Sequence, residues 1–173
     1  MMAAATTSLP ETPGGERNWD YRYTWIRDAT FMLWGLSTLG FDREASDFLY
    51  FITDRLETGQ RLKIMYGIDG RASLPEVTLD HLSGYEGAKP VRIGNDACHQ
   101  AQHDVWGVLL DSMRLHIRSG DRLDDRLWPL VVRQVDDAVA HWREPDCGIW
   151  EVRGEPQHFT SSKIFCWVAA DRG

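Results

Sequence analysis

The chain carries a candidate proton donor, Glu151, in a turn-forming segment just ahead of an apolar run. Trp150 comes immediately before it, and glycine and proline residues on both sides predict a loop between two helices, where site residues tend to lie. A carboxyl group held against an aromatic ring loses hydration, and this loss disfavours its charged form. We therefore expect a carboxyl group that stays protonated near neutral pH. Glu155 is nearby, but the proline after it favours an exposed turn.

A second group of residues, near the N-terminus, has the chemistry to bind a sugar. Tyr21, Tyr23 and Trp25 alternate, so their rings would share one face of an extended segment. Arg27 and Asp28 follow at the start of an apolar helix, and a guanidinium beside a carboxylate can make several hydrogen bonds to one hexose. The alternative is that Asp28 caps this helix and pairs with Arg27.

A metal site is the third chemical possibility. His99 and His103 are four residues apart, with Cys98 and Asp104 beside them, and this spacing on a helix could hold zinc. No glutamate stands next to the first histidine, as a zincin needs, and no third ligand is obvious. A solvated or buried histidine pair is the favoured interpretation. The sequence also lacks a phosphate-binding glycine loop and a G-x-S-x-G turn.

Charge and composition argue against several classes of function. The net charge is −7, from 26 acidic and 19 basic side chains, so we expect no nucleic-acid or membrane binding through a basic patch. The three cysteines have no paired spacing, which favours a reducing compartment. No apolar run approaches the roughly 20 residues of a membrane span, and the N-terminus resembles no secretory signal. We therefore expect a cytoplasmic location.

The hydrophobic fraction of 43% is enough for a packed core. Eight tryptophans are many for 173 residues, and their surroundings divide six of them into two groups. We expect core packing for Trp34, Trp128 and Trp167, and ligand-facing rings for Trp19, Trp25 and Trp150.

Apolar periodicity predicts an all-α fold. Residues 28–39 and 160–171 are apolar nearly all round and predict buried helices. Residues 42–57 and 123–143 have one apolar stripe each and predict surface helices, whereas 96–118 predict one long mixed helix. The alternation favours two concentric helical layers over a four-helix bundle, in which every helix would be amphipathic.

Two segments break the helical pattern. Residues 1–17 are small, polar and interrupted by proline and glycine, and we interpret them as a linker or a strand leading into the domain. Residues 58–95 hold many glycines and short extended runs, which predict an irregular, hairpin-containing insertion that walls a cleft.

Five short motifs occur in a fixed order along the chain. They are NWDYRYTWIRDA at 18–29, IMYGIDG at 64–70, LDHLSGY at 79–85, PVRIGN at 90–95 and GIWEVRG at 148–154. Together they resemble glycoside hydrolase family 15, the bacterial glucoamylase-like and trehalase-like proteins, and the resemblance covers residues from about 5 to 173.

The resemblance implies a fold and an activity. The family's fold is an (α/α)6 toroid of twelve helices in two rings, of which residues 18–173 would supply about five, in the N-terminal half. The family releases glucose from the non-reducing end of α-glucosides with inversion, and the resemblance implies no cofactor. Whether the substrate is starch, isomalto-oligosaccharide, glucodextran or trehalose stays open at this point.

The resemblance also implies roles for individual residues. Glu151 matches the general acid that protonates the leaving oxygen. The residues that match substrate-binding positions are Arg27 and Asp28 for the glucose itself, Trp25 and Trp150 for aromatic walls, Tyr21 near the attacking water, and Arg92 and Asn95 at the border of the cleft.

The chain departs from the family in one respect that matters for chemistry. An inverting enzyme needs a second carboxylate roughly 6.5–9.5 Å from the acid, and in the family this base comes from the C-terminal half of the toroid. Since the sequence ends at Gly173, we expect a truncated chain that lacks the base, is inactive alone, and self-associates or binds the remainder of the toroid. The alternatives are an inactive carbohydrate-binding or regulatory relic, and a metal hydrolase.

Overall fold

The computed structural model describes residues 1–56, 61–118, 120, 122–123 and 125–173. They form two compact units, each treated by itself below. The β unit comprises Met1–Trp25 and Met65–His99, and the helical unit comprises Ile26–Ile64 and Gln100–Gly173. The described residues are mostly helical, as expected for part of an (α/α)6 toroid. None of their helices is both long and apolar enough to cross a membrane.

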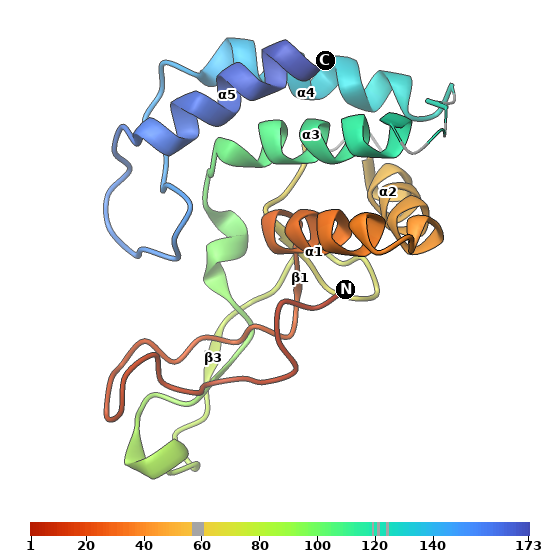
Figure 1. Ribbon diagram of the computed structural model, residues 1–173. Helices are drawn as coiled ribbons and strands as arrows, with labels where there is room; N and C mark the ends of the chain where they lie inside the picture. Colours follow the sequence, from red (N-terminus) through yellow and green to blue (C-terminus); the bar gives the residue numbers. More distant parts are fainter. Residues whose placement is uncertain (57–60, 119, 121, 124) are drawn as a thin grey trace. The chain divides into compact units, whose positions relative to one another are not determined.

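The helical unit is built around one central helix. Figure 1 shows α3 between α1 on one side and α4 and α5 on the other, and α2 packs against α1 and α3. The helices are α1 (Ile26–Thr38), α2 (Asp42–Leu56), α3 (Asp104–Arg118), α4 (Trp128–His141) and α5 (Thr160–Arg172). The side chains that α3 buries include Val105, Trp106, Val108, Leu109, Leu110 and Met113, so this helix forms the centre of the unit's core.

Close approach of α5 to α3 depends on a glycine. A Cβ atom added to Gly107 would lie 2.1 Å from the carbonyl oxygen of Phe165, a distance that no real contact permits. The absence of a side chain therefore lets the two backbones touch, and this contact sets how closely α5 packs against α3 at Phe165.

The long helix predicted over 96–118 is wrong at its start. The chain instead forms a short 3-10 helix, η2 (Asp96–His99), and α3 begins only at Asp104. The backbone N–H of His103 donates to Oδ2 of Asp146 at 2.9 Å, and the carbonyl of Ala101 accepts from Cys147 at 2.8 Å. Because these groups bond to a distant loop, they are not available to continue a helix.

The prediction that two helices are covered on every side is also wrong for this chain. On α1, Phe31 and Trp34 are 58% and 60% exposed, and on α5 Trp167 is 62% exposed. Trp128 of α4 is exposed as well. The three tryptophans assigned to the core therefore lie at the surface, because an apolar segment does not reveal whether all of its faces have a partner.

The β unit consists of short antiparallel pairings and turns. Strand β1 (Thr24–Trp25) pairs with β2 (Met65–Tyr66), and β3 (Val77–Thr78) pairs with β4 (Arg92–Ile93). A short 3-10 helix, η1 (Tyr85–Gly87), lies between β3 and β4. The irregular, hairpin-containing insertion predicted over 58–95 is confirmed from residue 61 onward, while 58–60 lie outside the described residues.

The first residues of the chain run along the segment that carries the tyrosines. Ala3 donates its backbone N–H to the carbonyl of Tyr23, Ser8 donates to Trp19, and Thr7 forms an antiparallel bridge with Asp20. This part of the predicted linker thus lies along the aromatic segment. The division of the chain at residue 17 stays a prediction.

Candidate active site

Glu151 lies in the middle of a loop that joins α4 to α5 and is closed at its base. Asp146 and Gln157 form an antiparallel bridge, with N···O distances of 2.9 and 2.8 Å. At Gly148 the backbone has φ +70°, and an added Cβ would lie 3.0 Å from the ring of Phe159. The bridge and this turn hold the ten intervening residues as a compact loop, as the sequence predicts for a site segment.

The base of the loop is also anchored to α5 and to the segment before α3. The carboxylate of Asp146 is fully buried, and its Oδ2 accepts hydrogen bonds from the N–H of His103 at 2.9 Å and from the hydroxyl of Ser162 at 2.7 Å. Burial lowers the pKa of His103 despite the nearby charge of Asp146, so this imidazole is neutral at pH 7. Its ring stacks on Trp106, with centroids 4.9 Å apart.

Glu151 is buried and forms an ion pair. Glu151 is 7% exposed, and its Oε1 lies 2.7 Å from Nη2 of Arg153. A guanidinium at this distance favours a charged carboxylate, which opposes the protonated state expected from the sequence. The indole of Trp150 is 72% exposed, so its ring is accessible to a ligand. The general-acid role of Glu151 stays a prediction.

Arg27 is held at the start of α1 by two acceptors. Its Nη1 donates to Oε1 of Gln102 at 3.1 Å and to Oδ2 of Asp104 at 2.7 Å. Asp104 is fully buried; burial raises its pKa, and the charge of Arg27 opposes this only in part. The alternative in which Arg27 pairs with Asp28 is therefore wrong.

The other polar atoms of Arg27 and Asp28 have no hydrogen-bond partner among the described residues. Nε and Nη2 of Arg27 hold three N–H groups, and none of them forms a hydrogen bond with the described residues. Asp28 is exposed and likewise forms no hydrogen bond or ion pair within the described part of the chain. Together they offer three donors and a carboxylate to a ligand, which is the polar complement a hexose needs.

Tyr21 and Trp25 lie together in the β unit. Their ring centroids are 6.3 Å apart with planes at 51°. Trp25 and Trp19 are only 4% and 7% exposed, so neither ring forms the open surface expected from the sequence. Tyr23 is buried too, and its hydroxyl bonds to Asp20. The wall contributed by Trp25 and the water-positioning role of Tyr21 stay predictions.

Arg92 makes contacts that stabilise the β unit itself. Its guanidinium forms an ion pair with Glu76 at 3.1 Å and lies 4.7 Å from the ring centroid of Trp19. Nη1 also donates to the backbone carbonyls of Glu16 and Asn18. These contacts occupy much of the donor capacity that the resemblance assigns to substrate.

Asn95 has a similar structural position. Its side chain is fully buried, donates to the carbonyl of Asp20 at 3.3 Å and accepts from the N–H of Ala97 at 2.9 Å. The structure thus gives Asn95, like Arg92, a part in holding the β unit together. Their place at the border of a cleft stays a prediction.

Asp20 is a buried charge that the sequence reasoning missed. It accepts from Nε and Nη2 of Arg22, each at 2.8 Å, and from the N–H of Gly94 at 3.1 Å. Burial alone raises its pKa, but the hydrogen bonds and charge of Arg22, with the N–H of Gly94, outweigh burial and the net pKa is lowered. The sequence signal that could have found Asp20 is its position between two aromatic residues, Trp19 and Tyr21.

The two histidines that could have held zinc do not share a helix. His99 belongs to η2 and His103 to the segment before α3, so they are not on one helix turn. Within the ranges that the structure describes, no three His, Cys, Asp or Glu side chains gather as metal ligands would.

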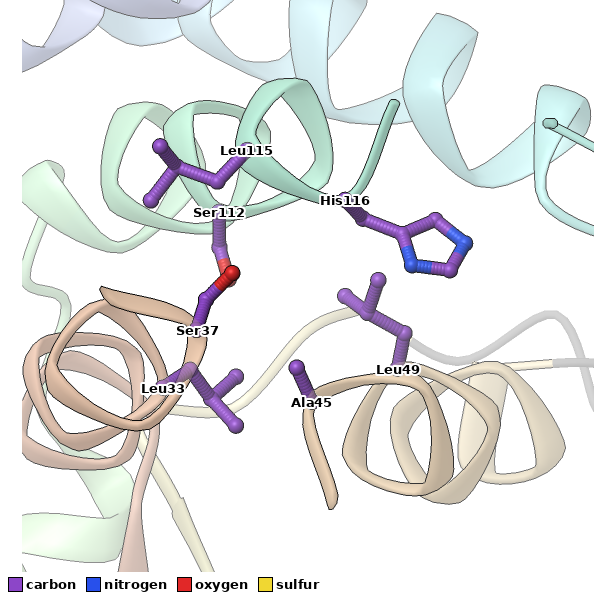
Figure 2. Close-up of a pocket in the computed structure, with 7 residues that line it drawn as sticks. All are labelled: Leu33, Ser37, Ala45, Leu49, Ser112, Leu115 and His116. Carbon is purple, nitrogen blue, oxygen red and sulfur yellow. The ribbon is translucent and has the colours of Figure 1, made fainter. Parts of the chain in front are cut away.

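Figure 2 shows a pocket between α1, α2 and α3 that none of the predicted site residues lines. It is lined by Leu33, Ser37, Ala45, Leu49, Ser112, Leu115 and His116. Its cavity volume of about 10 Å³ leaves room for about one water molecule, so it cannot hold a sugar.

Comparison with known proteins identifies close relatives. The sequence matches the model of glycosyl hydrolases family 15 over residues 1–173. A trehalase from Mycolicibacterium smegmatis is 63% identical over 177 residues, covering 100% of this chain and 26% of that protein, and a trehalase from Mycobacterium tuberculosis gives the same values. A trehalase from Thermoplasma volcanium is 41% identical, with 99% and 27% covered. The chain thus spans about a quarter of these relatives, and no solved structure matches it.

Proposed function

The chain belongs to glycosyl hydrolases family 15, and from this premise we propose that it is part of an enzyme that hydrolyses trehalose. The observation that carries the proposal is the identity of 63% to proteins named trehalase over the whole chain. Motif resemblance alone leaves starch, isomalto-oligosaccharide and glucodextran open, whereas all three relatives named above are trehalases.

In the proposed reaction Glu151 is the general acid. Its carboxyl group gives a proton to the oxygen between the two glucose units as the bond from that oxygen to the anomeric carbon breaks. Water attacks the same carbon from the opposite face and loses a proton to a second carboxylate, so the configuration is inverted. Burial of Glu151 in a clamped loop supports the role, because a positioned acid must not rotate away from the oxygen it protonates.

Arg27 and Asp28 bind the glucose whose bond is broken, in this proposal. Three N–H groups of Arg27 have no partner within the described residues, and Asp28 is exposed. The exposed indole of Trp150 stacks on the sugar next to Glu151. Hydrogen-bonding groups on one side and an aromatic ring on the other suit a glucose ring, which has hydroxyls at its edge and apolar C–H faces.

The second carboxylate is supplied, we propose, by sequence outside these 173 residues. About three quarters of each relative's length is not matched by this chain. The 173-residue chain by itself is then expected to release negligible glucose from trehalose. Glucose release that disappears in Glu151→Gln of the same chain would contradict this expectation.

The test of the proposed function uses the full-length protein that carries these residues. Glu151→Gln keeps the shape of the side chain but cannot donate the acid proton, so kcat for trehalose should fall about 100-fold or more. Glu155→Gln, in the same loop, is the matched control and should retain the activity. Magnetic resonance of freshly released glucose reports inversion at the anomeric carbon.

Two results would overturn the proposal. If wild type and Glu151→Gln release glucose equally, Glu151 is not the acid. The second result is a wild type that binds trehalose but hydrolyses none of trehalose, maltose, isomaltose and glucodextran. The chain would then belong to the inactive carbohydrate-binding alternative.

A further inference from the structure

A continuous line of hydrogen bonds runs from Arg27 to the loop of Glu151. Nη1 of Arg27 donates to Oε1 of Gln102 at 3.1 Å, and Nε2 of Gln102 donates to Oε1 of Gln100 at 3.2 Å. Nε2 of Gln100 then donates to the carbonyl oxygen of Val152 at 2.9 Å, one residue beyond Glu151. All of these residues belong to the helical unit.

Each amide in this line accepts on one side and donates on the other. The direction is set at the Arg27 end, because a guanidinium can only donate and must therefore face the oxygen of Gln102. The amide nitrogen of Gln102 then faces the oxygen of Gln100, and the nitrogen of Gln100 faces a carbonyl that can only accept. Amides aligned head to tail in this way strengthen one another.

The backbone of the same segment is attached to the base of the loop. The carbonyl of Ala101 accepts from the N–H of Cys147 at 2.8 Å, and the N–H of His103 donates to Asp146 at 2.9 Å. These backbone bonds keep residues 100–103 non-helical. Ala101 and His103 carry the backbone bonds, and the side chains of the alternate residues, Gln100 and Gln102, point to one side of the segment, where they meet. Gln102 is 2% exposed, so water competes little for its bonds.

We propose that Gln100 and Gln102 are positioning residues that fix the distance between the sugar-binding Arg27 and the acid Glu151. This proposal rests on the proposed function. Gln102 orients the guanidinium, so that its remaining donors point toward the sugar, and Gln100 fixes the main chain next to the acid. The sugar-binding guanidinium and the proton donor are then held at a fixed distance from each other, although 124 positions separate residue 27 from residue 151 in the sequence.

The test measures kcat and KM of the full-length protein with Gln100→Met and Gln102→Met. Methionine keeps the length of the side chain but neither donates nor accepts these bonds. Gln100→Met should lower kcat for trehalose on the order of 10-fold, because a small displacement of a catalytic group is costly. Its KM should change little, since Arg27 keeps its contacts with Gln102 and Asp104.

A substrate with a different leaving group separates positioning from general damage. α-Glucosyl fluoride needs little proton transfer to its leaving group, so the loss in Gln100→Met should be much smaller for it than for trehalose. A loss of equal size on both substrates would contradict a role in positioning the acid.

The double variant tests whether the two amides act as one unit. Once either amide is gone the line is broken, so the double variant should lose no more than the worse single variant. Fold-losses that multiply would overturn the proposal. Gln134→Met is the matched control, since Gln134 is a fully buried glutamine of α4 whose amide bonds to its own helix at Leu130. It should leave kcat and KM unchanged.

Failure of this inference can be told from failure of the proposed function. If wild type is active and Glu151→Gln is not, but Gln100→Met behaves like Gln134→Met, only the positioning role of Gln100 and Gln102 is wrong. If wild type hydrolyses no α-glucoside, both are wrong. Should Gln102→Met not fold, Gln102→Glu replaces it: a carboxylate still accepts from Arg27 but cannot donate to Gln100, and the same loss of kcat is expected.

Discussion

Arg27 and Asp104 are joined by an ion pair that is 2.7 Å long and whose carboxylate is fully buried. The pair connects the first turn of α1 to the first residue of α3, across 77 positions of sequence. Because Nη1 is the only guanidinium nitrogen that bonds to the described residues, the pair orients the guanidinium and leaves Nε and Nη2 open to a ligand. In the proposed function, Asp104 would therefore act on substrate binding through its ion pair with Arg27.

Replacing Asp104 with asparagine should weaken substrate binding more than turnover. The amide oxygen still accepts from Nη1, but a neutral acceptor loses about 1 kcal/mol relative to a charged one. We expect KM for trehalose to rise about fivefold in the full-length protein, with a smaller change in kcat, measured by steady-state kinetics. Asp111→Asn, on the same helix and paired with Arg172 at the surface, should not change KM. A KM unchanged in Asp104→Asn would contradict the role.

The lowered pKa of Asp20 predicts a pH-dependent contribution to stability. A carboxylate with a lowered folded pKa stabilises the fold above its unfolded pKa of about 3.9, and this contribution is lost as pH falls through the folded pKa. Asp20→Asn should therefore reduce the free energy of unfolding at pH 7 by about 2 kcal/mol. The difference from wild type should shrink steadily below about pH 4.

Denaturant unfolding of both proteins at several pH values measures this difference. Asp69→Asn is the control in the same unit, because its ion pair with Arg71 is 3.8 Å long and mostly exposed, and it should change stability little at any pH. A deficit in Asp20→Asn that is as large at pH 3 as at pH 7 would show that the charge of Asp20 is not the source.

Helix positions could be predicted from the sequence where the chain's own periodicity decides them. The helices predicted over 28–39, 42–57 and 160–171 begin and end within a few residues of α1, α2 and α5. The start of α3 could not be predicted in this way. It depends on bonds from His103 and Ala101 to a loop more than 40 residues later, and no local pattern records those partners.

The candidate site shows the same contrast between features set by the local sequence and features set by distant partners. Glu151, Arg27 and Asp28 could be named as candidates, and the loop and the helix start that carry them could be predicted, because their residue types and neighbours mark both. The buried partners could not be identified. Asp104 is a partner of Arg27 only through the packing of α3 against α1, and an isolated aspartate at the start of a helix has the same sequence signature as a surface cap.

Gly107 allows a sharp test of the contact between α3 and α5. Alanine at this position would place a methyl group 2.1 Å from the carbonyl oxygen of Phe165, which is backbone and cannot rotate away. The helices must separate, so we expect Gly107→Ala to destabilise the fold by about 1–3 kcal/mol, measured by thermal or denaturant unfolding.

Gly35 provides the matched control for that measurement. It lies in α1, and an added Cβ would meet no atom within 4 Å. Gly35→Ala should therefore be neutral or stabilise the chain by up to about 1 kcal/mol, because alanine is the better helix former. Equal effects of the two substitutions would mean that α3 and α5 do not approach as closely as described.

The exposed apolar side chains of α1 and α5 predict self-association of the 173-residue chain. Phe31 and Trp34 on α1 and Ile164 and Trp167 on α5 are each more than half exposed. Apolar surface of this kind drives association, so the chain should elute in size-exclusion chromatography as oligomers or aggregate at micromolar concentration. Trp34→Gln combined with Trp167→Gln should increase the monomer fraction, whereas Arg43→Gln, an exposed polar change on α2, should not. A sharp monomer peak for the unmodified chain, independent of concentration, would contradict the prediction.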